Sequence, residues 1–62
     1  MNGYKINNMP ASASHYEFVV VRLVGDELWY YGAYRDGFQA DQVAYSVGGI
    51  IVHNVRIQGY QP

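Results

Sequence analysis

The feature that most constrains the fold is a strand–turn–strand pattern in the middle of the chain. Residues 16–24 read YEFVVVRLV, a run of β-branched and aromatic residues that is typical of a strand. Gly25 and Asp26 follow, and a glycine in the first position of a two-residue turn supplies the positive φ that tight hairpins require. Residues 27–34, ELWYYGAY, have the composition of a returning strand. The pattern predicts a β-hairpin.

The two-residue turn also predicts how the two strands of this hairpin are aligned. The expected cross-strand pairs are Val24 with Glu27, Leu23 with Leu28, Arg22 with Trp29, Val21 with Tyr30 and Val20 with Tyr31.

After the hairpin the hydrophobic period changes from that of a strand to that of a helix. Asp36 and Gln39 have the spacing of a capping box, which marks the start of a helix. Apolar residues then recur at helical spacing, namely Ala40, Val43, Ala44 and Val47. Gly48 and Gly49 are expected to end the helix, because a glycine tolerates the left-handed conformation that follows a last helical turn. Residues 50–57, IIVHNVRI, are predicted to form a third strand.

These elements predict an α+β protein with the order β-β-α-β. We expect a three-stranded antiparallel sheet with the strand order 2-1-3 and the helix packed on one face. This order places the most apolar strand in the centre of the sheet and leaves the second strand as a free edge, where a partner can add a strand. The alternative is that the third strand pairs beside the second.

The chain is expected to form one small domain preceded by a flexible arm. Residues 1–14 are rich in Asn, Ser, Ala and Gly and are predicted to be the arm, while residues 15–60 form the single domain. The arm has few apolar side chains with which to dock, namely Tyr4, Ile6 and Met9. With 62 residues and no Cys, the chain buries only about 60% of its unfolded surface, and such scaffolds often rely on oligomerisation.

The two faces of the predicted sheet differ in one charged residue. Arg22 lies on the face opposite to Val19, Val21 and Leu23, and an unpaired buried cation is very costly. We therefore expect the helix to cover the face without Arg22, together with Leu28, Tyr30, Ile50 and Val52. The other face is predicted to be open and to form the binding surface. Its residues are Tyr16, Phe18, Val20, Arg22, Trp29, Tyr31, Ile51, His53 and Val55.

An open aromatic face of this size predicts an interaction protein. Soluble monomers seldom expose a contiguous apolar patch beyond a few hundred Å². Two copies of the sheet packed face to face would cover this surface, and twofold pairing is the commonest oligomer geometry. We expect a homodimer, and the alternative is a monomeric module whose open face binds another protein, a peptide or single-stranded nucleic acid.

Charge and hydropathy argue against several other partners. The net charge of −1, from four Lys and Arg against five Asp and Glu, does not favour binding to a phosphate backbone. Aromatic side chains on a sheet can stack on bases, but the basic surround that RNA-binding sheets use is missing here. No apolar run approaches the ~18–20 residues of a membrane span, and the first 15 residues lack the pattern of a secretory signal. We expect a cytoplasmic protein without a membrane partner.

The sequence lacks a recognisable catalytic or metal-binding pattern. It has two His and no Cys, and neither His15 nor His53 has a second ligand at metal-binding spacing. The serines are not part of a nucleophile motif, and Gly48 and Gly49 end a helix rather than open one, which is the wrong polarity for a phosphate loop. We expect no enzymatic activity and no cofactor.

Residues 27–52, from ELWYYGAY through RDGFQADQVAYSVGG to IIV, resemble small uncharacterised proteins of Gram-positive bacteria and their phages or mobile elements. In these, a strand that ends in an aromatic-Gly-x-Tyr stretch leads to a helix of A-x-x-VA type, a glycine and an apolar strand. The resemblance implies the β-β-α-β order and no established activity or site residues. A phage-type origin would imply an inhibitor or adaptor that binds a host protein.

Overall fold

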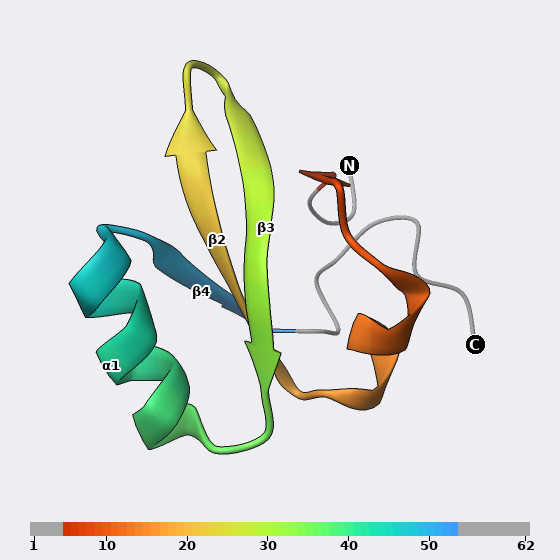
Figure 1. The fold of residues 1–62 in the computed structure, drawn as a ribbon, viewed down its shortest axis with the longest axis vertical. Helices are drawn as coiled ribbons and strands as arrows, with labels where there is room; N and C mark the ends of the chain where they lie inside the picture. Colours follow the sequence, from red (N-terminus) through yellow and green to blue (C-terminus); the bar gives the residue numbers. More distant parts are fainter. Residues whose placement is uncertain (1–4, 54–62) are drawn as a thin grey trace.

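The structure, a computed structural model, describes residues 5–53 (Figure 1). The elements in chain order are β1 (Ile6–Asn7), a 3-10 helix η1 (Ala11–His15), β2 (Phe18–Val24), β3 (Glu27–Tyr34), α1 (Gly37–Val47) and β4 (Ile50–His53).

The sheet has four strands in the order β1-β3-β2-β4. β2 is antiparallel to both of its neighbours, while β1 runs parallel to β3. The α+β class is therefore confirmed, and β2 lies between β3 and β4, but the expected three-stranded, purely antiparallel sheet is wrong. The difference arises because Ile6 and Asn7 pair with Leu28 and Trp29 and so occupy part of the edge that was expected to be free.

The hairpin between β2 and β3 follows the predicted register only near its turn. Gly25 has a φ of 63°, as the tight turn requires, and the pairs from Val24–Glu27 to Val21–Tyr30 are as predicted. Beyond them the register shifts, because Val20 pairs with Gly32 rather than with Tyr31. Tyr31 is thus the extra residue of a β-bulge, and the bulge moves the rest of β3 out of the predicted register.

The glycine after this bulge makes room for an aromatic ring on the same strand. A Cβ built on Gly32 would lie 2.7 Å from the hydroxyl oxygen of Tyr34. The Tyr34 ring therefore lies over the backbone of Gly32, where any larger residue would displace it. Tyr34 packs with the residues under α1, while Tyr30 packs on the opposite face.

The helix begins and ends where the sequence predicts. The side chain of Asp36 accepts a hydrogen bond of 3.0 Å from the backbone N–H of Phe38, which is the N-cap contact that this residue type favours. At the other end Gly48 has a φ of 67°, and the backbone N–H of Gly49 donates to the carbonyl of Ala44 at 2.8 Å. This closing pattern satisfies helical carbonyls that would otherwise lack partners.

Both faces of the sheet are covered around the middle of β2. Val19, Val20 and Val21 are consecutive and all have 0% exposure, although alternate side chains of a strand point to opposite faces. One cluster joins Val20 to Ala40 and Ala44 of α1, with five partly buried residues packed around it: Phe18, Tyr34, Val43, Val47 and Ile51. The other cluster is formed by Ile6, Val19, Val21 and Val52, with Met9, Leu28, Tyr30 and Ala33 packed against it.

The helix therefore packs on the face opposite to the one predicted. It covers Val20, whereas Val19 and Val21 are covered by the N-terminal segment, and Figure 1 shows these two coverings on opposite sides of the hairpin. The prediction was wrong because it treated Arg22 as a residue that the helix would have to bury. Arg22 lies beyond the residues that pack against α1 and is exposed, so its charge carries no burial cost.

The segment expected to be a flexible arm carries regular structure in its described part. Pro10 and Tyr16 flank η1, in which the N–H of Ala13 donates to the carbonyl of Pro10 at 3.1 Å. Ala13 is 2% exposed, and Ile6 belongs to the cluster around Val19. The division into an arm of residues 1–14 and a domain of residues 15–60 stays a prediction, but residues 5–15 contribute to the core.

Candidate functional site

The described residues of the predicted open face fall into three groups, and α1 covers one of them. Phe18, Val20 and Ile51 lie under α1, and the fully buried Val20 has no surface to offer to a partner. The helix takes the place that a second copy of the sheet was expected to fill. Val20 is therefore core rather than a binding surface, whereas Phe18 and Ile51 are only partly buried beneath the helix.

Two more of the predicted residues, Tyr16 and His53, make contacts near the start of β2. The guanidinium of Arg35 lies 5.0 Å from the ring centroid of the half-buried Tyr16, a cation–π geometry. His53 is exposed, and its ring stands edge-on to Phe18 with a centroid distance of 5.0 Å. Both contacts join neighbouring elements within the chain.

The remaining predicted residues lie toward or at the other end of the hairpin. Arg22, Trp29 and Tyr31 are all exposed, and Arg22 and Trp29 are cross-strand partners. Tyr31 is separated from this pair by the change of register at the bulge. Val55 lies outside the described residues.

Arg22 and Trp29 belong to a surface that we call the tip face. It consists of Arg22, Val24, Glu27 and Trp29, which alternation and pairing place on one face of the hairpin beside its turn. The pairing of β4 with β2 ends at Val21, so β2 continues past β4 toward the turn. Figure 1 shows this end of the hairpin projecting beyond α1 and β4.

Apolar side chains at this end of the hairpin are exposed on both faces. Val24 is 56% exposed and Trp29 is 41% exposed on the tip face, and Leu23 is 66% exposed on the opposite face. Removing such side chains from water lowers the free energy by roughly 25 cal/mol per Å² of apolar surface. The tip is therefore a candidate interaction surface.

The tip face also carries charges of both signs. Arg22 forms no ion pair within residues 5–53, whereas Glu27 accepts a hydrogen bond of 3.2 Å from the side-chain amide of Asn7. A small hollow of about 310 Å³ lies beside the turn, lined by Lys5, Asn7, Asp26, Glu27 and Leu28. The apolar pair on the tip face is thus flanked by a free cation and by carboxylates.

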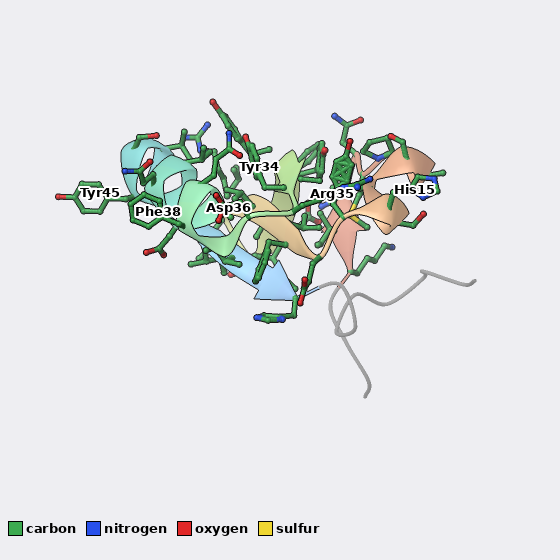
Figure 2. The ribbon with its side chains drawn as sticks, turned by 90° about the horizontal axis from the view of Figure 1, so that it is seen from below. His15, Tyr34, Arg35, Asp36, Phe38 and Tyr45 are labelled. Atoms are coloured by element: carbon green, nitrogen blue, oxygen red, sulfur yellow. The ribbon has the colours of Figure 1, made fainter. Side chains whose placement is uncertain are left out.

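A second exposed surface, which was not predicted from the sequence, lies on the outer side of the helix. Phe38 is 71% exposed and Tyr45 is 91% exposed, and Figure 2 shows both rings pointing outward at the end of the molecule opposite His15. The signal was present, because residues seven positions apart share one side of a helix and this side lies opposite Ala40 and Ala44. Tyr45 also lines a groove of about 680 Å³ between α1 and β4. We call it the helix–strand groove; its lining residues are Asp41, Gln42, Ala44, Tyr45, Gly49, Ile50 and Ile51.

Among residues 5–53 no three His, Cys, Asp or Glu side chains lie close enough to hold a metal ion. Burial raises the pKa of the partly buried Tyr30, and the nearby Tyr34 and Tyr16 raise it further. That the chain is not an enzyme and needs no cofactor stays a prediction. Within the described part of the chain no helix is long and apolar enough to cross a membrane.

Comparison of the chain with family models, curated proteins and solved structures found no match.

Proposed function

We propose that this protein is a small interaction protein that forms a homodimer through its tip face. The single observation that carries the proposal is the exposed apolar pair Val24 and Trp29 on the projecting end of the hairpin. The proposal keeps the homodimer expected from the sequence and two of its predicted interface residues, Arg22 and Trp29. It moves the interface from the middle of the sheet, which α1 covers, to the end of the hairpin.

A second copy fits this surface because the tip face is complementary to itself. In a twofold interface the same patch faces its own copy, so Arg22 of one protomer can approach Glu27 of the other, and the reverse pair forms by symmetry. Val24 and Trp29 each lie next to both charges, since Arg22 pairs with Trp29 and Val24 with Glu27, and they would pack against their counterparts. The two hairpins would then be about 10 Å apart, the usual spacing of packed sheets.

Light scattering over a wide range of protein concentration tests this proposal. We expect the mass of two chains at high concentration, falling to the mass of one chain on dilution. Trp29→Ala should weaken the dimer about tenfold or more, because buried Trp residues dominate many interfaces. The mass of a single chain at every concentration would overturn the homodimer.

A charge-reversal series tests the pairing itself. Arg22→Glu and Glu27→Arg should each weaken the dimer, by up to about tenfold for the two symmetric pairs, because each places like charges opposite each other. The double variant should recover most of the loss. Phe38→Ala is the control, because Phe38 lies on the outer side of α1 and should leave the dimer unchanged. A double variant that is weaker than both single variants would contradict the pairing of Arg22 with Glu27.

A further inference from the structure

The helix–strand groove combines an exposed sheet edge with an apolar wall. β4 forms one side of the groove and α1 the other, with Ile50 52% exposed on the strand and Tyr45 almost fully exposed on the helix. The groove volume of about 680 Å³ lies within the range of ordinary ligand pockets, ~300–1,000 Å³. A segment of extended chain is the shape that fits beside a strand.

The main chain of β4 offers hydrogen bonds along its outer edge. β4 pairs with β2 on one side only, and within residues 5–53 no strand pairs with its other side. Natural edge strands are commonly protected by lysine, proline or a bulge. β4 reads Ile-Ile-Val-His and pairs with β2 without a register shift, so its described edge has none of these three protections, although the strand itself is short, with four residues. Its free N–H and C=O groups favour the addition of a strand.

The negative charge of Asp41 indicates which kind of segment the groove favours. The carboxylate of Asp41 lies on the groove wall and forms no hydrogen bond or ion pair with another described residue. A cationic side chain is the complement of this group, whereas the groove itself contributes no Lys or Arg. In an added strand every second side chain points toward the helix, so a basic residue facing Asp41 would be followed two positions later by a residue facing the apolar wall.

A second copy of the chain is a poorer occupant of this groove. If two β4 strands paired antiparallel across a twofold axis perpendicular to the sheet, the two helices would lie on the same face and the grooves that contain the two Asp41 side chains would meet. Like charges that approach each other are destabilising, and the groove has no cation to separate them. The groove is therefore distinct from the tip face in both its charge and its partner.

We propose that the helix–strand groove binds an extended, basic segment of another protein as an added strand on β4. The main chain of the segment pairs with Ile50–His53, a Lys or Arg side chain reaches Asp41, and apolar side chains pack against Tyr45, Ala44 and Ile51. This inference is independent of the homodimer, since it uses a different surface of the molecule.

Titration with defined peptides, followed by the backbone amide signals of isotope-labelled protein, tests the proposal. The probe is a capped hexapeptide, Lys-Thr-Val-Thr-Lys-Thr, in which Lys and Val share one face of the extended chain, and its matched control has Glu in place of each Lys. We expect signals to shift at residues 41–45 and 50–53, with the Lys peptide binding about fivefold or more tightly than the Glu peptide. Methylation of alternate backbone nitrogens in the Lys peptide should weaken binding about fivefold, because it removes main-chain hydrogen bonds. Equal binding of all three peptides, or shifts confined to other residues, would overturn the proposal.

Variants of the groove separate its two contributions. Asp41→Asn should remove the preference for the Lys peptide over the Glu peptide while the Lys peptide still shifts the signals of β4. Tyr45→Ala should weaken both peptides about fivefold or more through lost apolar contact, whereas Phe38→Ala removes an exposed aromatic residue outside the groove and should change neither. Each variant is first shown by its thermal unfolding to be folded. Equal losses in Tyr45→Ala and Phe38→Ala, or self-association that Tyr45→Ala abolishes, would contradict a peptide site in the groove.

Discussion

The two faces of the sheet are covered by elements of very different kinds. Behind Val20 lies α1, an eleven-residue helix with an N-cap, a glycine stop and four apolar residues on its inner side. Behind Val19 and Val21 lies the segment of residues 5–15, which contributes a two-residue strand, a short 3-10 helix and single side chains such as Ile6. Both nevertheless exclude water completely from the valines beneath them. Burial of a face thus does not require a periodic element, only enough apolar contact.

The same comparison explains where the free surfaces lie. α1 has an outer side that carries the exposed Phe38 and Tyr45 and against which no other element of residues 5–53 packs. The described part of the N-terminal segment meets the hairpin end only along the edge of β3, where β1 pairs with Leu28 and Trp29 and Asn7 donates to Glu27. Among residues 5–53, most of the exposed large apolar side chains therefore lie on the outer side of the helix and toward the hairpin end, and Ile50 at the start of β4 is a further one.

The largest effect is expected for Ile6, the buried residue by which the N-terminal segment packs over Val19 and Val21. Ile6→Ala should lower the free energy of unfolding by about 3 kcal/mol, because it removes a buried side chain and leaves a cavity over Val19 and Val21. Urea denaturation measures the change. Ile50→Ala is the matched control, as the same substitution at a half-exposed position should cost less than about 1 kcal/mol. Equal losses in the free energy of unfolding for the two variants would mean that Ile6 does not fix the N-terminal segment over Val19 and Val21.

A pair of neighbouring valines compares the two covers directly. Val20→Ala and Val19→Ala each remove two buried carbon atoms and should each lower the free energy of unfolding by about 2 kcal/mol. Equal losses in urea denaturation are expected because both residues are fully buried. A much smaller loss for Val19→Ala would show that the N-terminal segment relaxes into the space while α1 does not.

Loss of the N-cap of α1 should have a smaller effect on stability, and this effect should be confined to α1. Asp36→Ala removes the acceptor for the Phe38 N–H and should lower the free energy of unfolding by about 1 kcal/mol. Amide hydrogen exchange should quicken in the first turn of α1 more than in β1. Asp26→Ala, at an exposed residue of the hairpin turn, is the control and should leave exchange in α1 unchanged; equal acceleration in both variants would contradict the capping role.

The smallest predicted effect concerns Tyr30, which packs against the cluster beneath the N-terminal segment. It is a change in the free energy of unfolding that develops only at alkaline pH. Because the pKa of Tyr30 is raised in the folded protein, the fold favours the neutral phenol. Its contribution is complete below the unfolded pKa of about 10 and is lost as the pH rises through the higher folded value. Free energies of unfolding measured from neutral to alkaline pH should fall more steeply for the parent protein than for Tyr30→Phe. Identical slopes for the two proteins would contradict this assignment.

Local chemistry explains why much of the fold was predictable. The turn at Gly25, the four cross-strand pairs beside it, the cap at Asp36 and the stop at Gly48 depend on residues close together in the sequence. The central position of β2 also followed from its apolar composition. The same run contained an unused signal, because four apolar residues without a polar one in Phe18–Val21 are typical of a strand buried on both faces.

The candidate site was less predictable, because it depends on which surfaces other elements leave uncovered. Arg22 and Trp29 stay exposed as expected, but Val20, which was assigned to the same open face, is core. Phe38 and Tyr45 were missed because the helix was assessed for its inner side alone. Exposure is a property of the whole arrangement, so a list of residues on one face of a strand does not decide it.

The sequence by itself determined the hairpin, the helix with its two ends, and the central position of β2, because these follow from turn conformation, capping and hydrophobic period. Only the tertiary structure decided that α1 lies over Val20, that residues 5–15 cover Val19 and Val21, and that Tyr31 forms a bulge. Alternation divides a strand into two faces but does not say what will cover either one. That choice is made by packing between segments far apart in the chain, where the total apolar contact and the reach of each connection decide the outcome.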